Sequence, residues 1–216
     1  STTGKVVATI VKDLPKDNSL KEEYIANKFV SMAMDPIMEF DVDRKWNSFE
    51  DYLGALSSKY RVRAKNVIKK MEGVEIRDFS SQDFARYKDA LYALYKGVQQ
   101  KSPVRLLSCK IDYLFNLLNL SNDRIVFRTF WKDNVIIAFM TVVLNGKELE
   151  AHHIGFDYKL NKQSAIYQNI LYHYIELAIQ HKMNKISFGR TALEIKSTVG
   201  AYPVDHLAFI RLENKI

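Results

Sequence analysis

Residues 135–156 read VIIAFMTVVLNGKELEAHHIGF, and this stretch decides the fold. Its first part, Val135–Leu144, is an apolar run rich in β-branched residues, which favours a buried strand. The run is far shorter than the roughly 20 residues that a membrane-spanning helix needs. It ends at Asn145-Gly146, a dipeptide typical of a two-residue hairpin turn, and Leu149–Phe156 again suits a strand. We therefore predict two antiparallel strands joined by a tight turn.

The segments on either side extend this hairpin into a mixed sheet. Ile125–Trp131 predicts a third strand, joined to the hairpin by a turn at 132–134, so the three strands form an antiparallel meander. Apolar residues at helical spacing then predict a helix from Lys162 to His181. Lys185–Phe188 predicts a strand parallel to 149–156, because a helix crossover separates the two. Two further elements follow, a short helix at 191–199 and a last strand at 207–212.

The first half of the chain is mainly helical. Ser19 resembles an N-cap, with Glu22 at the capping-box spacing, for a helix that reaches Met34 and is ended by Pro36. Ser48 is the expected cap of a long helix through Met71. The other expected elements are strands at 5–11, 37–42 and 74–76 and helices at 81–100 and 104–118. Together these elements predict an α/β (α+β) fold, a twisted mixed sheet with helices on both faces.

Composition narrows the class of protein. The 216 residues are 47% hydrophobic, which suits a packed globule with a substantial core. The single cysteine, Cys109, cannot form an internal disulfide, lies in an apolar run and predicts a buried, inert thiol in a reducing, cytoplasmic setting. Residues 1–5 lack the apolar segment of a signal peptide, and no run is long enough to span a membrane. The net charge of +7 fits either anionic partners or ordinary solubilising charge.

The order of elements, a β-meander followed by strand, helix, strand, short helix and strand, resembles the core of the GNAT-type acyltransferases over residues 49–216. The closer resemblance is to the branch of FemAB-like peptidoglycan aminoacyltransferases and related bacterial acetyltransferases. The segments that carry it are 49–53 (FEDYL), 59–61 (KYR), 167–169 (YQN), 188–191 (FGRT), Lys196 and Gly200-Ala201. Residues 1–48 are then an N-terminal extension or the tail of a preceding GNAT-like half, since FemAB-like proteins carry two such halves.

The resemblance implies three functions, which stay open. The first is an N-acyltransferase that moves an acyl group from acyl-CoA, in most cases acetyl-CoA, to a small-molecule amine. The second is a Fem-like aminoacyltransferase that uses aminoacyl-tRNA in cell-wall biosynthesis, and the third is a catalytically silent binding domain. GNAT enzymes place a glycine-containing loop before the helix that holds the cofactor pyrophosphate, whereas residues 159–165 here read KLNKQSA. The missing glycine counts against conventional acetyl-CoA binding and for the other two functions. The absence of the helical coiled-coil arm that Fem-type ligases often carry for tRNA counts against the second, and acyl-CoA transfer is the leading hypothesis. A homodimer also stays open.

The resemblance places the acyl donor between strands 149–156 and 185–188, which splay apart in GNAT folds. Two adjacent histidines lie on the first of these strands, and strand alternation predicts that they point to opposite faces. His153 shares its face with Ala151 and Gly155, whose small side chains leave room for a ligand. His153 is therefore the candidate general base, with a hydrogen-bonded core histidine as the alternative. His152 is expected to pack, or to line the substrate site.

The remaining candidates come from the helices and loops around the same strands. Gln163, Ser164, Tyr167 and Asn169 are the candidate cofactor-binding residues at the start of the crossover helix. Arg190 and Lys196 are candidates for binding a phosphate or a substrate carboxylate, and Tyr202 is a candidate donor of a proton to a leaving thiolate. Each of these also has a purely structural interpretation, such as packing or a solvated helix end.

The helix at 48–71 carries a basic face that suggests contact with RNA, although Glu50, Asp51 and Glu72 interrupt it and a solvated face is equally ordinary. No group of cysteines and histidines has the spacing of a zinc site, so no metal is expected. No P-loop, dinucleotide fingerprint or nucleophile elbow is present.

Overall fold

The computed structural model describes residues 6–101, 110–120 and 123–213, and Cys109 lies outside these ranges. One mixed sheet of eight strands runs through the molecule in the order β1-β8-β2-β7-β6-β5-β4-β3. Only β6 and β7 are parallel, and every other pair is antiparallel. The strands are β1 Ala8–Pro15, β2 Val30–Asp41, β3 Glu75–Asp78, β4 Ile125–Lys132, β5 Val135–Asn145, β6 Glu148–Phe156, β7 Lys185–Ser187 and β8 Tyr202–Leu212.

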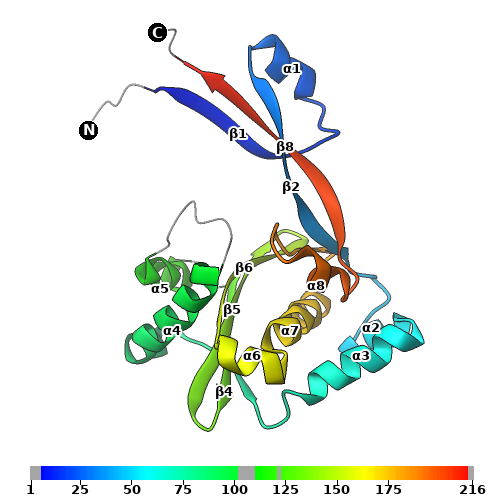
Figure 1. Ribbon diagram of the computed structural model, residues 1–216, viewed down its shortest axis with the longest axis vertical. Coiled ribbons are helices and arrows are strands. Elements are labelled where there is room, and N and C mark those ends of the chain that lie inside the picture. Colours follow the sequence, from blue (N-terminus) through cyan, green and yellow to red (C-terminus); the bar gives the residue numbers. More distant parts are fainter. Residues whose placement is uncertain (1–5, 102–109, 121–122, 214–216) are drawn as a thin grey trace.

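Helices cover both faces of the central strands, as the sequence predicts (Figure 1). The helices α4 and α5 lie on one face, and α2, α3, α6, α7 and α8 lie on the other. Their bounds are α1 Lys21–Ala26, α2 Phe49–Ala55, α3 Ser58–Lys69, α4 Ser81–Lys101, α5 Ile111–Leu120, α6 Tyr158–Ser164, α7 Ile166–Gln180 and α8 Leu193–Ser197. Because β5 is packed between the two helical layers, both of its faces are apolar, which explains its continuous hydrophobic run.

The hairpin at the centre of the sheet is confirmed, but its turn lies one residue later than the predicted Asn145-Gly146. Asn145 pairs with Glu148, so the turn residues are Gly146 and Lys147, and Gly146 has the positive φ of 61° that opens such a turn. The turn between β4 and β5 is also tight, with positive φ at both Asp133 and Asn134. This combination is characteristic of hairpins whose twist matches that of the flanking strands.

The parallel pair β6–β7 is short, and this shortness creates the site described below. Register pairs run only from Glu148 with Lys185 to Glu150 with Ser187. Beyond Glu150, β6 continues to Phe156 without a pairing partner on the β7 side. The two strands therefore diverge within the sheet, as the GNAT resemblance implied.

The predicted helix from Ser19 to Met34 is wrong. The helix α1 covers only Lys21–Ala26, its N-cap is Leu20 without a side-chain cap, and the chain enters β2 at Val30. Residues 30–39 pair with β8, which lies more than 160 residues further along the chain, so tertiary pairing overrides the local helical pattern. Pro36 lies at an irregularity of this ladder between Met34 and Ile37, where a missing N–H costs no regular hydrogen bond.

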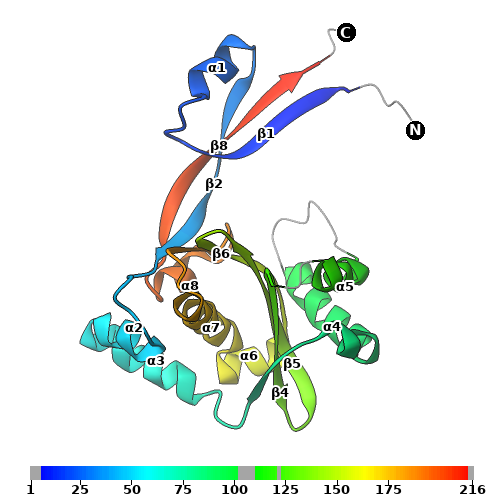
Figure 2. The same cartoon turned by 180° about the vertical axis from the view of Figure 1, so that it is seen from behind.

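Together, β1, the first half of β2, the last half of β8 and α1 form an arm that projects from the body (Figure 2). The arm's strands are part of the same sheet as the body, because β2 and β8 continue into it. The assignment of residues 1–48 to the tail of a preceding half stays a prediction.

Two predicted long helices are each divided in two. Ser48 caps α2 with a complete capping box to Asp51, as expected, but the helix stops at Leu56 and α3 begins at Ser58. The crossover helix is divided into α6 and α7 by Ala165, which adopts a left-handed conformation at φ 47° and ψ 43°.

Candidate active site

A β-bulge places both strand histidines on the same side of the sheet. Met140 pairs with Ile154 and Val142 with Ala151, so His152 and His153 together face the single residue Thr141. Such a bulge breaks strict alternation. The predicted opposite orientation is therefore wrong, and the two imidazole centroids lie 4.2 Å apart. Both rings contact Tyr113 of α5, which places them toward the α4–α5 layer.

The two histidines differ in their hydrogen bonding. The ring nitrogens of His152 lie 3.2 Å from the Thr141 hydroxyl and 3.1 Å from the Tyr113 hydroxyl, so both are satisfied within the protein. The His153 backbone N–H donates to Thr141, whereas its ring meets Tyr95 edge-on and hydrogen-bonds to no side chain among the described residues. Burial, followed by the charge of His152, lowers the pKa of His153 to about 4, so its ring is neutral at pH 7. Burial also lowers the pKa of His152, against the pull of Glu150.

Gly155 serves helix packing rather than ligand access, which corrects the sequence interpretation. A Cβ at this position would lie 2.3 Å from a Phe139 ring carbon and 2.8 Å from the Tyr95 backbone nitrogen. The missing side chain therefore lets α4 lie directly on β6. This close approach brings Tyr95, Val98 and Gln99 of α4 next to the histidines.

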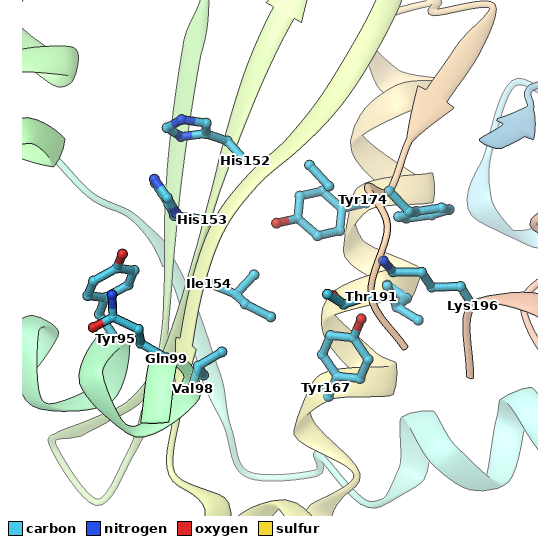
Figure 3. Close-up of a pocket in the computed structure, with 13 residues that line it drawn as sticks. Tyr95, Val98, Gln99, His152, His153, Ile154, Tyr167, Tyr174, Thr191 and Lys196 are labelled. Atoms are coloured by element: carbon cyan, nitrogen blue, oxygen red, sulfur yellow. The ribbon is translucent and has the colours of Figure 1, made fainter. Parts of the chain in front are cut away.

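A cavity of about 270 Å³ opens where β6 diverges from β7. Its walls come from α4 on one side of the sheet and from α7, α8 and the loop after β7 on the other (Figure 3). It is lined by Tyr95, Val98, Gln99, Ala151, His152, His153, Ile154, Tyr167, Leu171, Tyr174, Phe188, Thr191 and Lys196. A second cavity of about 300 Å³ shares Val98, Ile154, Tyr167 and Thr191 with it, so the two form one groove that continues to Lys101 and Tyr158.

Lys196 is the most unusual group in this cavity. Its residue is only 2% exposed, and its Nζ donates to the Gly189 carbonyl at 3.2 Å. No ion pair with a carboxylate is present for it among the described residues. Burial alone lowers the pKa of Lys196 to about 8. In Figure 3 its amine end points from α8 into the space opposite Ile154 of β6.

Four of the predicted site residues therefore line one cavity: His152, His153, Tyr167 and Lys196. Burial raises the pKa of Tyr167 to about 12, so its hydroxyl stays protonated. The Tyr167 backbone N–H, at the start of α7, donates to Asn161 Oδ1 at 2.8 Å.

The other predicted cofactor-binding residues have structural contacts or lie at the surface. The Asn169 side chain donates to the carbonyls of Val67, Ser164 and Ala165, and so ties α7 to α3 and α6. Ser164 is buried in α6, and Gln163 is exposed. None of these three residues lines the cavity that contains Lys196.

Arg190 and Tyr202 point elsewhere. Arg190 forms an ion pair with Asp13 of β1 at 2.5 Å, which joins the loop after β7 to the arm. The Tyr202 hydroxyl donates to the Asp41 carboxylate at 2.8 Å, at the opposite end of β2 from the arm. Neither residue lines the cavity, so the structure does not bring them together with His153.

Several lining residues escaped the sequence interpretation. Tyr95 and Tyr174 belong to helical apolar stripes that predict only a core, and Thr191 was part of a quoted motif without a role of its own. The buried Tyr174 hydroxyl donates to the Thr141 carbonyl at 3.3 Å, next to the bulge. These residues line one cavity because β6 diverges from β7. No local sequence pattern predicts that divergence.

A basic hollow of about 420 Å³ lies on α3, on the side that meets the start of α7. Its cations are Lys59, Arg63 and Lys70, which repeat at helical spacing, and its wall includes Ala165 and Gln168. No carboxylate lines the hollow, and none of the three cations takes part in an ion pair among the described residues.

Neither a metal site nor a membrane span is found in the described part of the chain. Within residues 6–101, 110–120 and 123–213, no three histidine, cysteine or carboxylate side chains gather in a way that could hold a metal ion. The helices of these ranges are too short or too polar to cross a bilayer.

The comparison with solved structures identifies the fold. FemX matches with a TM-score of 0.68 at 11% identity, covering 96% of this chain and 72% of that one. The L-PGS structure from Bacillus licheniformis matches with a TM-score of 0.64 at 10% identity, covering 93% and 67%. A conserved protein of unknown function from Bacteroides thetaiotaomicron matches with a TM-score of 0.66 at 12% identity, covering 94% and 69%. No family model matches the sequence. No curated protein sequence matches it either.

These matches extend over nearly the whole chain, arm and body together. The fold is therefore the GNAT-like, Fem-like fold, which confirms the fold that the sequence resemblance implied. At identities of 10–12% the likeness establishes the fold alone.

Proposed function

We propose that the protein transfers an acyl group to an amine acceptor in the cavity between β6 and β7. The observation that carries the proposal is that one cavity contains both a buried lysine and a neutral imidazole. Among the described residues, the lysine has no counter-ion and the imidazole nitrogens have no hydrogen-bond partner. Uncompensated buried charge is costly to keep, and such groups concentrate at functional sites.

Lys196 suits the stabilisation of an oxyanion. When an amine attacks an acyl carbonyl, negative charge develops on the carbonyl oxygen, and a preorganised donor in a dry site lowers the energy of that state. The ammonium form of Lys196 has three N–H donors, and its one hydrogen bond among the described residues goes to Gly189. Two donors are left to face the cavity.

His153 stays our candidate for the group that accepts the acceptor's proton. Its neutral ring can accept a hydrogen bond from an amine N–H, which orients the nitrogen toward the acyl carbon. With a pKa of about 4 the ring holds a proton only weakly, so the proton has to pass on to water. His152, whose two nitrogens are already bonded, acts as a positioning residue that fixes the neighbouring ring.

The residues at the start of α7 do not fit the pyrophosphate of acyl-CoA, and we derive no step through that donor. In a pyrophosphate site the first backbone N–H groups of the helix point at the ligand. Here the Tyr167 N–H is taken by Asn161, and the preceding Ala165 amide donates to the Asn161 carbonyl at 2.8 Å. A helix turn, α6, lies directly against this end in place of a glycine-containing loop.

An aminoacyl ester carried by RNA is the donor that these observations favour. The sequence resemblance to the Fem-like branch implies aminoacyl-tRNA donors. The basic hollow on α3 offers Lys59, Arg63 and Lys70 without a competing carboxylate, which suits a phosphate backbone. The hollow also adjoins the start of α7, whose partial positive charge adds to the attraction for phosphate.

Single-turnover transfer assays test both the reaction and the donor. Purified protein is incubated with radiolabelled aminoacyl-tRNA, or with labelled acetyl-CoA, and a panel of primary amines that includes lysine and ethanolamine. We expect labelled amide only with aminoacyl-tRNA, and its loss in Lys196→Met but not in Lys132→Met, which alters an exposed lysine on the β4–β5 turn. Transfer from acetyl-CoA alone would overturn the donor assignment. No transfer from either donor would overturn the proposed reaction and favour a silent binding domain.

A further inference from the structure

Lys196, in the cavity between β6 and β7, has a second chemical capacity. All other lysines of the described residues are exposed or half-buried, whereas Lys196 is 2% exposed and yet lines a cavity. Its neighbours in the cavity wall include Phe188, Leu171 and Ile154, and no carboxylate lines the same space. A buried site whose described lining has no opposite charge favours the uncharged amine, which is the nucleophilic form of lysine.

We propose that Lys196 is a self-acylation site, a nucleophilic lysine that takes an acyl group from activated acyl compounds such as acyl phosphates, thioesters and aminoacyl esters. The structural basis is the cavity itself. It is large enough, at about 270 Å³, for a small acyl group beside the amine, and its groove continues past Tyr167 and Thr191 to the surface near Lys101. The amine end faces this space rather than the protein core (Figure 3).

The step balances without an outside oxidant or metal. The lone pair of neutral Nζ attacks the carbonyl carbon, and a C–N bond forms. The bond from that carbon to the leaving oxygen or sulfur then breaks, the leaving group departs as an anion, and the surplus amine proton passes to it or to water. The product is an amide on Lys196, which is neutral and stable.

The uncharged fraction of each lysine amine explains why Lys196 should react faster than the other lysines. With a pKa of about 8, roughly 9% of the Lys196 amine is uncharged at pH 7. An exposed lysine with an ordinary pKa of about 10.4 has only about 0.04% in that form. A less basic amine is also less nucleophilic, so we expect a net advantage of about tenfold rather than the full ratio.

Acylation would remove the one lysine ammonium among the described residues that line this cavity. If Lys196 stabilises the oxyanion, the modified protein is switched off, and this consequence rests on the proposed function. The modification itself does not, because it needs neither RNA nor an amine acceptor.

The test uses acetyl phosphate as the only reagent. The folded protein is incubated with it at several pH values, digested, and the acetylation rate of each lysine is followed by mass spectrometry. We expect Lys196 to react at least about tenfold faster than the exposed Lys132, with a rate that rises through about pH 8. In concentrated urea the difference between the two lysines should disappear. Peptide mapping separates Lys196 from the α-amino group, which also has a low pKa.

Equal or slower acetylation of Lys196 in the folded protein would overturn the proposal. That result would leave the transfer assay unaffected, since a permanently protonated Lys196 can still stabilise an oxyanion. Conversely, fast self-acetylation in a protein that transfers nothing to amines would overturn the proposed function alone.

Discussion

Lys196 is buried although its ammonium form carries a charge, and burying a charge is costly. Lys196 loses its hydration in the cavity and gains one neutral hydrogen bond, to Gly189, without a counter-ion among the described residues. An apolar residue of similar shape would avoid that cost. Lys196 nevertheless lies in α8, a short helix that packs against β2, β8 and α7, which points to selection for chemistry rather than for stability.

The variant Lys196→Met separates these two roles. We expect it to raise the free energy of unfolding at pH 7 by up to roughly 3 kcal/mol, because a shift of the pKa from 10.5 to about 8 opposes folding by that amount. We expect the same variant to lower the transfer rate by about 10²–10³-fold, the usual effect of a lost oxyanion donor. Urea unfolding and single-turnover rates measure the two quantities. A variant that is both destabilised and inactive would indicate a structural lysine.

The pH dependence of stability tests the environment of His153. Its pKa falls from 6.5 to about 4 on folding, so between these values the unfolded chain binds more protons than the folded one. The stabilisation from the neutral ring is complete above pH 6.5 and is lost as the pH falls toward 4, by up to roughly 3 kcal/mol. His153→Phe, which keeps the ring shape but does not titrate, should show a shallower loss than the parent protein in urea unfolding. His181→Phe, at an exposed position, should unfold like the parent at every pH.

At the residue level the sequence predicted part of the site. It selected His152, His153, Tyr167 and Lys196, all of which line one cavity. It did not predict that both histidines share a side, because period-2 alternation cannot reveal a bulge opposite Thr141. It also did not predict the burial of Lys196, since a lysine near the end of a short helix is ordinarily solvated.

At the scale of elements, the contact between β6 and α4 fixes the histidine wall of the cavity. Gly155 lies against the backbone of Leu94 and Tyr95, so the helix rests on the strand at the point where the bulge ends. The substitution Gly155→Ala should destabilise the protein by about 1–3 kcal/mol, since the new methyl group overlaps backbone that cannot move independently. Gly54→Ala, on the open surface of α2, has no neighbour within 4 Å and is the matched control. Thermal and urea unfolding measure the stability of both variants. Equal stability of Gly155→Ala and Gly54→Ala would show that α4 is not held by this contact.

At the scale of elements, variants of the basic hollow on α3 test whether it binds the RNA that carries the donor. Replacing Lys59, Arg63 and Lys70 together by Gln should weaken binding of tRNA and reduce the steepness of its salt dependence by up to about three phosphate contacts. Lys65 and Lys69 lie on the same helix outside the hollow, and their double replacement by Gln is the control for net charge when it is compared with the double replacement of Lys59 and Lys70. Filter binding at several salt concentrations measures the affinity for tRNA and its salt dependence. If the two sets of variants weaken binding equally, the hollow has no specific role.

Element prediction succeeded where local pattern and tertiary environment agree. The hairpin at 135–156 has turn chemistry, β-branched residues and burial that all favour strands. The segment 19–34 has a local capping pattern but contributes to a ladder with β8, and the distant partner prevails. The break at Ala165 had no local signal either, because alanine rarely adopts a left-handed conformation.

At the scale of the whole molecule, the sheet is continuous but its protection is uneven. The body strands lie between two helical layers, and β5 buries Phe139, Met140 and Val142 completely. In the arm, the described residues cover one face, where Tyr24 of α1 stacks on Phe209. The sequence gives no sign of this difference, because β8 is as apolar as the body strands.

We therefore expect the arm to open locally without unfolding of the body. On its uncovered face Ile10 is 61% exposed, Val30 71% and Met32 52%, so opening there loses little buried apolar surface. Native-state hydrogen exchange should give arm amides of β1 and β8 an opening free energy several kcal/mol below that of β5 amides, which should exchange only by global unfolding. Phe209→Leu should accelerate exchange in the arm and leave β5 unchanged, since it weakens the contact with α1 alone. Exchange of arm and body amides at one common free energy, shifted together by Phe209→Leu, would mean instead that the eight strands unfold as a single cooperative unit.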